Sequence, residues 1–397
     1  MDRDVEQDGK KKRELLYDFF TTCDAPLSEE EEMSLNPILN ALNHTKARYD
    51  APTLIAEGGE KRVYKVYDQH LNRFVAMAQS AKAQTPNEQE QFLREGQLTA
   101  NLNHPNIVPI HNMGLDSGGV PFFSMELVPG DSLKDIIKKL KADDLPYKTQ
   151  YTQEVLLGIF NKVCDAVAYA HSRGVLHLDI KPDNIRVGQF GEVLLCDWGL
   201  ARVIDHGHLG EAEPGQLDAN MLNDMTLTGT MKGTPGFMAP EQVNNQKKTG
   251  QTDIYALGSL LYFILTHELP VGGESACEVV ENTRKGNIIH PRKYRPKRSV
   301  PTGLAAVVMK ALALDPVDRY ENVQALQSEI VLFLSDFPTE AEQASRLTRA
   351  GLLAQRHRKL TFWSLAFATL LIVVMSINLT LIRREKQATE VDRKSVV

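Results

Sequence analysis

The chain has 397 residues and a formal net charge of −6 at pH 7, because 45 lysine and arginine residues stand against 51 aspartate and glutamate residues. This charge disfavours a protein that binds nucleic acid through bulk positive charge, so no nucleic-acid partner is expected. Hydrophobic residues make up 42% and charged residues 24% of the chain, which excludes wholesale disorder. The four cysteines include no CxxC pair, which argues against a zinc ribbon or a disulfide framework and suits a reducing compartment.

The secondary-structure signals change along the chain. Residues 1–47 form a charged leader in which Ser28 and Glu31 have capping-box spacing, so one or two amphipathic helices are expected there. Short β-type runs dominate from residue 48 to about residue 135, with one helical stretch at 88–102. Helical periodicity then prevails, at 153–172, 253–266, 303–313 and 322–334. This order predicts an α+β fold, with a small β-rich lobe before a larger helical lobe.

The sharpest change in composition lies between Lys359 and Arg383, because residues 360–382 contain no charged residue. A helix of this length would be roughly 34 Å long, enough to cross a hydrocarbon core of about 30 Å. A buried core helix is the alternative, but charged residues flank both ends. We expect one transmembrane helix, preceded by a juxtamembrane linker over residues 336–359 and followed by a short polar tail over residues 383–397.

The strongest local pattern is the run HLDIKPDN at 177–184, and the tripeptide DWG at 197–199 follows it. Phosphoryl transfer needs a carboxylate that orients the attacking hydroxyl and accepts its proton, a cation near the phosphoryl group, and oxygen ligands for magnesium. The residues that supply these groups, in that order, are Asp179, Lys181, Asn184 and Asp197.

With Ala239-Pro240-Glu241 further on, the joint order and spacing of these motifs resembles the eukaryotic-like (Hanks-type) serine/threonine protein kinases, particularly bacterial membrane-anchored members. The resemblance covers residues 48–335 and implies a two-lobed protein kinase domain, with an N-lobe over 48–128 and a C-lobe over 129–335. It implies ATP and Mg2+ as cofactors and serine or threonine hydroxyls of proteins as substrates. Because ATP is intracellular, we expect a single-pass cell-membrane protein with a cytoplasmic kinase domain, and self-association through the span or the kinase domain is a further expectation.

The resemblance implies a role for each residue of the catalytic motifs. Asp179 looks like the catalytic base, and Lys181 looks like the residue that stabilises the γ-phosphate. Asn184 and Asp197 look like the magnesium ligands. Thr234 resembles the threonine that contacts the catalytic aspartate.

Three further positions look architectural. Glu241 and Arg319 resemble the buried ion pair that braces the helical lobe of the family. Asp253 resembles the helix residue that holds the catalytic loop.

Adenine-binding positions follow from the same likeness. Met125 resembles the residue at the back of the adenine pocket, and Glu126 and Val128 would offer backbone groups to adenine. Val63 and Ala76 correspond to the residues that cover adenine.

The nucleotide lobe departs from the family pattern at two places. The phosphate-covering loop keeps the central Gly58, followed by Gly59, but it lacks the first and third glycines of GxGxxG. The strand lysine that pairs with the phosphates is replaced by Ala78, although its helix partner corresponds to Glu95.

Lys61, which replaces the third glycine, is a candidate for the missing cation. Alternate residues of a strand share a face, so Lys61 would point to the same side as Val63, where the methyl group of Ala78 leaves room for a long side chain. This placement resembles that of the with-no-lysine kinases.

Other interpretations of the missing strand lysine stay open. Lys61 as an exposed loop lysine is one, and a lysine reaching back from position 82 is another, although Lys82 lies more than about 13 Å along the strand from Ala78. Loss of efficient nucleotide binding is the third. At the level of function, the alternatives are a membrane-anchored pseudokinase that binds nucleotide and partners, and a small-molecule phosphotransferase.

The residue before the catalytic aspartate bears on how the activity is regulated. Many family members have an arginine before the catalytic aspartate that pairs with a phosphorylated activation loop, and this chain has Leu178 there. We therefore expect phosphorylation of Thr226, Thr228 or Thr230 to change activity only modestly. No metal beyond magnesium is expected, because the histidines at 206 and 208 have no third ligand nearby in the sequence.

Overall fold

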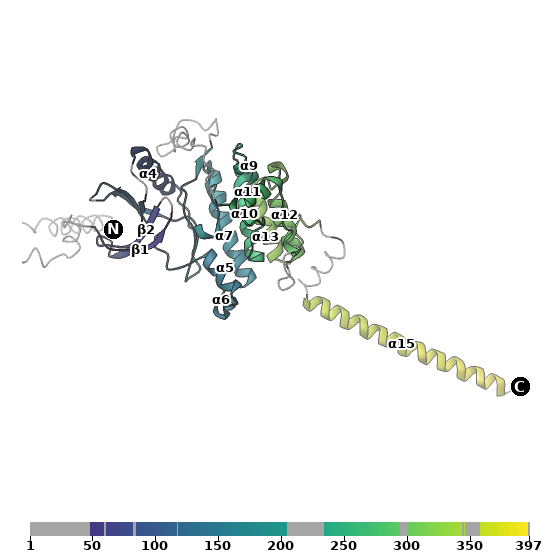
Figure 1. Cartoon of the computed structure of the whole chain (residues 1–397). Coiled ribbons are helices and arrows are strands. Elements are labelled where there is room, and N and C mark those ends of the chain that lie inside the picture. The colour runs from purple at the N-terminus through teal and green to yellow at the C-terminus, as the bar shows by residue number, and fades with distance from the viewer. Residues whose placement is uncertain are drawn as a thin grey trace, which may run out of the picture. The chain divides into compact units, whose positions relative to one another are not determined.

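A computed structural model describes residues 48–58, 61–81, 85–116, 118–204, 234–293, 300–343, 345 and 358–395 (Figure 1). The chain divides into two compact units, Met1–Gln84 with Asn112–Leu127 and Thr85–His111 with Val128–Val397. The first unit holds a β-sheet, and the second unit holds the helices and two small sheets. The expected α+β class, with a β-rich part and a larger helical part, is confirmed. The expected leader helices lie outside the described residues.

The first unit is built on a five-stranded sheet with the order β1-β2-β3-β5-β4. Its strands are β1 (Tyr49–Glu57), β2 (Lys61–Asp68), β3 (Arg73–Ser80), β4 (Ile110–Leu115) and β5 (Pro121–Met125). The strands β2 and β3 are antiparallel, and Val63 lies opposite Ala78 while Lys65 lies opposite Ala76. Residues that lie opposite each other point to the same face of a sheet. One face of this sheet therefore carries Val63, Ala76 and Ala78 together.

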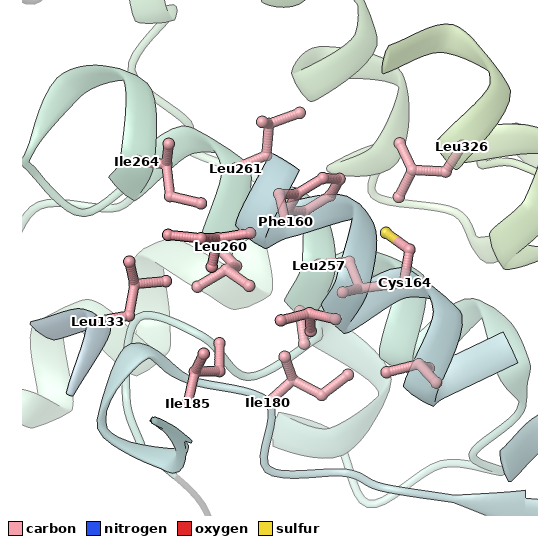
Figure 2. Packing of buried hydrophobic residues seen from close by; sticks show 14 of the residues in the cluster. Leu133, Phe160, Cys164, Ile180, Ile185, Leu257, Leu260, Leu261, Ile264 and Leu326 are labelled. Atoms are coloured by element: carbon pink, nitrogen blue, oxygen red, sulfur yellow. The ribbon is translucent and has the colours of Figure 1, made fainter. Parts of the chain in front are cut away.

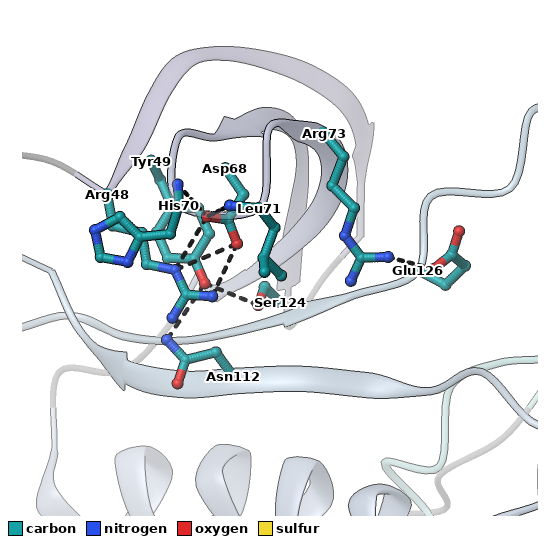
Figure 3. A network of polar contacts seen from close by, with 9 residues as sticks. All are labelled: Arg48, Tyr49, Asp68, His70, Leu71, Arg73, Asn112, Ser124 and Glu126. Carbon is teal, nitrogen blue, oxygen red and sulfur yellow. Dashed lines mark hydrogen bonds and ion pairs between the residues drawn. The ribbon is translucent and has the colours of Figure 1, made fainter. Parts of the chain in front are cut away.

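A buried carboxylate ties the start of β1 to the end of β2 (Figure 3). Arg48 donates to Asp68 from Nε at 3.1 Å and from Nη2 at 2.9 Å, and the Asp68 side chain is fully buried. The hydroxyl of Tyr49 lies 3.0 Å from Ser124 Oγ on β5, and Asn112 Nδ2 donates to the same hydroxyl. Burial alone would raise the pKa of Asp68, but the Arg48 guanidinium holds that pKa below its ordinary value. The network fastens the edge strand β1 to the rest of the sheet.

The second unit consists mainly of helices. They are α4 (Pro86–Ala100), α5 (Leu133–Lys141), α6 (Leu145–Gln150), α7 (Gln153–Ser172), α9 (Pro240–Val243), α10 (Gly250–Thr266), α11 (Ala276–Lys285), α12 (Thr302–Ala311), α13 (Val323–Leu334) and α15 (Arg358–Ser395). Short 3-10 turns lie at η1 (Pro182–Asn184), η3 (Pro291–Lys293) and η4 (Pro316–Asp318). One small sheet joins β6 (Gly130–Ser132), β8 (Ile185–Gly188) and β9 (Val193–Leu195), and the other joins β7 (Val175–Leu176) and β10 (Arg202–Val203).

The core of this unit surrounds α10, which contacts α7, α12 and α13. Leu257, Leu260 and Leu261 of α10 are fully buried, as are Phe160 and Cys164 of α7 (Figure 2). A helix that is apolar on all sides is stable only when it is surrounded by protein. The helix α10 is therefore a rigid support for the segments attached to its N-terminal turn, which include the catalytic motif.

The helix starts follow from local capping. The hydroxyl of Thr85 accepts from the backbone of Glu88 at the start of α4, and the Glu88 carboxylate accepts from the Thr85 backbone, which is a capping box. Ser132 caps α5 and Thr152 caps α7 in the same manner. The five helices expected after residue 85 are all present, with ends shifted by at most a few residues.

The C-terminal helix α15 is continuous from Arg358 to Ser395. Its window Ala366–Arg384 has a mean hydropathy of 2.0, and none of this window is buried against the described part of the chain. The buried-core alternative therefore finds no support in the described residues. By length and composition, α15 is the one helix among them that could cross a membrane.

Candidate active site

The loop between β7 and β8 brings the expected catalytic residues together. Lys181 Nζ donates to Asp179 Oδ2 at 2.6 Å and to Thr234 Oγ1 at 3.0 Å. Asn184 Nδ2 donates to the backbone oxygen of Asp179 at 3.0 Å and to its Oδ2 at 3.3 Å. One carboxylate oxygen of Asp179 thus receives both a cationic and an amide donor. The side chains of Asp179 and Lys181 are 10% and 18% exposed, so the ion pair is shielded without being sealed from solvent.

This arrangement fits a group that accepts a proton from a substrate hydroxyl. The Lys181 ammonium donates to the Asp179 carboxylate, and the Asn184 amide donates to the same oxygen and fixes the direction of the carboxylate. Thr234 links the ammonium to the segment that leads into α9. The loop can therefore present a carboxylate and an ammonium side by side, which is what transfer of a phosphoryl group to a hydroxyl needs.

The backbone of the loop is held by Asp253 in the first turn of α10. Its Oδ2 accepts from the backbone N–H of His177 at 2.9 Å and lies 2.8 Å from His171 Nε2, and its Oδ1 accepts from the N–H of Leu178 at 2.8 Å. Burial would raise the pKa of Asp253, but the hydrogen bond from His171 and the backbone donor hold that pKa below its ordinary value. Asp253 therefore stays ionised and fixes the peptide that precedes Asp179, which is the role expected for it.

A buried pair of aromatic rings also contacts the catalytic loop. The rings of His177 and Trp198 have centroids 4.5 Å apart, and both side chains are almost completely buried. His177 Nδ1 accepts from the backbone N–H of Asp179 at 3.2 Å. Burial lowers the pKa of His177, so its imidazole is neutral at pH 7. The neutral ring supports both the catalytic loop and the segment that carries Asp197.

Asp197 and Glu95 approach each other at Gly199. A Cβ atom placed on Gly199 would lie 3.0 Å from Glu95 Oε2 and 3.4 Å from Asp197 Oδ1. The glycine therefore leaves space that the two carboxylates use, and a side chain there would displace them. Asp197 has a φ angle of +64°, in the left-handed region where aspartate is among the tolerated residues. The helix glutamate and the aspartate of the DWG tripeptide thus form one acidic group within the second unit.

The donor set suits a hard divalent cation. The Asn184 amide nitrogen is engaged with Asp179, so its Oδ1 is left as an acceptor, and Asp197 adds a carboxylate. Magnesium is commonly held by one or two such oxygen donors together with water and substrate phosphates. Among the described residues, no group of three His, Cys, Asp or Glu side chains is placed for a metal.

The buried ion pair expected in the helical lobe is present. Arg319 Nη1 donates to Glu241 Oε1 at 2.8 Å, and Nη2 donates to Oε2 at 2.9 Å. The guanidinium also donates to the backbone oxygens of Ala313 and Gln251. The pair connects α9 to the end of η4, and Arg319 also reaches the first turn of α10.

The nucleotide-binding candidates of the first unit lie on one sheet. Lys61 opens β2 opposite Ser80, two residues before Val63, so both point to the face that carries Ala76 and Ala78. The side chain of Ala78 is 1% exposed. The backbone N–H of Gly58 donates to the Lys61 oxygen at 2.8 Å, which closes the turn between β1 and β2.

The remaining candidates divide between the two units. Met125 ends β5 opposite Ala76, and the carboxylate of Glu126 lies 3.4 Å from Arg73 Nη1. Val128 belongs to the second unit, where its Cγ1 lies next to Gly188. Several positions considered from the sequence fall outside the described residues: Gly59, Lys82, His206, His208, Thr226, Thr228 and Thr230.

Gln242 is a residue of the site that the sequence analysis did not single out. Gln242 donates from Nε2 to the backbone oxygen of Leu178 at 2.9 Å, and its Oε1 accepts from the N–H of Ala239 at 3.0 Å. Its position directly after Ala239-Pro240-Glu241 is the only sequence signal, and it does not reveal a partner 64 residues away.

Comparisons with known proteins agree with this geometry. The family model described as protein kinase domain matches residues 49–331. The chain is similar to the serine/threonine-protein kinase PknD of Chlamydia caviae, at 37% identity over 298 residues that cover 73% of this chain and 32% of the relative. For PknD of Protochlamydia amoebophila the identity is 38% over 289 residues, which cover 70% of this chain and 29% of the relative. The chain spans about a third of the length of the curated relatives it matches.

Proposed function

The chain belongs to the protein kinase family, and on that basis we propose that it transfers the γ-phosphoryl group of ATP to serine or threonine hydroxyls of proteins. The observation that carries the proposal is the contact of Lys181 with both Asp179 and Thr234. The relatives named serine/threonine-protein kinase support the same class of substrate.

The residues of the candidate active site have different roles in the proposed reaction. Asp179 accepts the proton of the substrate hydroxyl, and Lys181 holds its ammonium near the oxygens of the phosphoryl group that moves. Asn184 and Asp197 would hold Mg2+, which neutralises charge on the phosphates when it is bound. Asp253 and His177 keep the loop in place through its backbone.

We assign the missing strand cation to Lys61. The support is the register of β2 and β3, which puts Lys61 on the face of Val63 and beside the methyl group of Ala78. Met125, Glu126, Val128 and Ala76 are proposed to contact adenine.

Autophosphorylation of the full chain tests the proposed activity. The wild-type protein with Mg2+ and labelled ATP is expected to incorporate phosphate, and Asp179→Asn is expected to lower the rate by about 100-fold or more, because general base catalysis typically contributes that much. Tight binding of ATP without any incorporation in the wild type would instead support a membrane-anchored pseudokinase.

Two variants test the relocated lysine. Lys61→Met is expected to abolish most phosphate transfer, and the double change Lys61→Gly with Ala78→Lys is expected to restore part of it by returning the cation to β3. Lys65→Met is the matched control, because Lys65 lies on the same strand face but its ammonium covers the ring of Phe74 at 4.2 Å. Full activity of Lys61→Met would end the assignment.

The localisation follows from α15 and from the substrate. We propose a single-pass membrane protein whose kinase domain faces the cytoplasm, where ATP is found, and self-association remains a prediction. Protease protection in sealed vesicles checks the orientation.

A further inference from the structure

Leu178 occupies a backbone conformation that needs external support. Its φ angle is +63°, in the left-handed region that leucine rarely adopts. Such residues persist only when the surrounding structure holds them. Because Leu178 directly precedes Asp179, a change in the peptide between them would turn the carboxylate away from its partners.

Both polar groups of the Leu178 backbone are held by side chains from other elements. Its N–H donates to Asp253 Oδ1 of α10 at 2.8 Å, and its C=O accepts from Gln242 Nε2 of α9 at 2.9 Å. The same Gln242 amide accepts from the backbone N–H of Ala239 through Oε1 at 3.0 Å. One side chain thus joins the catalytic loop to the end of the segment that begins at Thr234.

The choice of glutamine is informative at this position. Gln242 is the third residue of α9, and it accepts from the N–H of Ala239, the residue before the helix, which is one half of a capping box. A glutamate would cap this N-terminus at least as well, because a carboxylate accepts from Ala239 N–H and interacts favourably with the helix dipole. Only an amide can also donate to the Leu178 carbonyl. The second hydrogen bond is therefore the part that helix capping does not explain.

We propose that Gln242 is a positioning residue for the proposed kinase reaction. Gln242 donates to the carbonyl of Leu178, while Asp253 accepts from its N–H. Because both backbone groups of Leu178 are held, the left-handed conformation is fixed and the Asp179 carboxylate stays directed toward Lys181. Because the same amide fixes Ala239, the catalytic loop and the Thr234 segment move as one. The proposal concerns the same site as the proposed function and rests on it.

Two substitutions separate the two hydrogen bonds. Gln242→Met removes both and keeps a similar side-chain length, while Gln242→Glu keeps the bond from Ala239 and removes only the donor to Leu178. Gln246 lies just beyond α9 and is exposed, so Gln246→Met and Gln246→Glu are the matched controls.

The kinetic measurement uses the full chain, ATP and a serine-containing protein substrate. Both Gln242 variants are expected to lower kcat by roughly threefold to tenfold, the effect of one neutral hydrogen bond, with the KM for ATP unchanged within about twofold. The two Gln246 controls are expected to match the wild type. Wild-type kcat in Gln242→Glu, with a loss only in Gln242→Met, would overturn the proposal and leave Gln242 a helix cap.

A second measurement does not depend on activity. Hydrogen exchange at the amides of Leu178 and Asp179 is expected to be faster in Gln242→Glu than in the wild type, with the melting temperature nearly unchanged. If the wild type transfers no phosphate, the proposed function fails. The exchange rates still test whether Gln242 holds the backbone of Leu178. Equal exchange in the wild type and Gln242→Glu would refute it.

Discussion

The catalytic residues lie within a few residues of one another in the sequence, and this explains why their grouping was visible there. Asp179, Lys181 and Asn184 belong to one loop, so their spacing alone brings them into hydrogen-bonding distance once the loop is formed. Contacts between distant segments were expected only where the family resemblance supplied them, as for Asp253 with the loop and Glu241 with Arg319. The bond from Gln242 to Leu178 and the approach of Glu95 to Gly199 each join residues more than 60 positions apart.

At the same scale, the buried imidazole of His177 makes stability depend on pH. Burial lowers the pKa of His177 in the folded protein, whereas the unfolded chain binds a proton with a pKa of about 6.5. The unfolded state therefore binds more protons below pH 6.5, so the stabilisation is complete above that pH and is lost as the pH falls toward the folded pKa.

We expect the free energy of unfolding of the wild type to fall between pH 7 and pH 5. It is expected to fall less in His177→Asn, because asparagine cannot take up the proton. Urea unfolding followed by tryptophan fluorescence measures this difference. His104, whose pKa is also lowered by burial, contributes equally in both proteins and serves as the internal reference. Parallel pH profiles of the two proteins would contradict the expectation.

At the scale of elements, five helices were predictable because they have a local cause. Amphipathic periodicity and the caps at Thr85 and Thr152 define α4 and α7 without reference to the rest of the chain, whereas α5, although Ser132 caps it, was not among the expected helices. The order of the sheet was not predictable in the same way, because β5 inserts between β3 and β4. Strand order depends on pairing between distant segments, which periodicity does not report.

The segment after α13 is attached to the second unit through one buried carboxylate. Glu329 is 3% exposed, and it accepts from the backbone N–H of Glu340 at 2.7 Å and of Ala341 at 3.1 Å. Thr339 next to them is buried against Gly303. The first residues of the expected juxtamembrane linker are therefore fastened to α13.

Glu329→Gln is expected to release this segment, because one oxygen that accepts an N–H is replaced by an amide that donates. The loss of about 1–2 kcal/mol corresponds to a rise of roughly fivefold to thirtyfold in hydrogen exchange at the amides of residues 340 and 341. Glu321→Gln, a change at an exposed glutamate near the start of α13, is the control. Rapid exchange at both amides already in the wild type would show that the carboxylate does not hold them.

At the scale of the whole molecule, the family match and the long apolar helix fall on different stretches of the chain. The protein kinase domain match ends at residue 331, and α15 begins at Arg358. The fold of the kinase units and the proposed membrane anchor can therefore be perturbed separately. Apolar side chains of α15 such as Leu370 and Val373 are largely exposed, and a membrane of the kind proposed above would cover them.

Arginine substitutions in α15 test whether this apolar helix inserts into a membrane. Leu370→Arg with Val373→Arg places two charges within the window Ala366–Arg384 and is expected to cost about 5–7 kcal/mol of insertion free energy, at about 2.5–3.5 kcal/mol for each arginine near the middle of the helix. The double variant should shift from the carbonate-resistant membrane fraction to the extractable fraction. Gln387→Arg with Val391→Arg lies beyond the window and should leave the distribution unchanged. Because the kinase units are untouched, phosphate transfer to a soluble protein substrate should persist in the extracted variant. If the double variant Leu370→Arg with Val373→Arg stayed in the carbonate-resistant fraction, α15 would not be a simple transmembrane span.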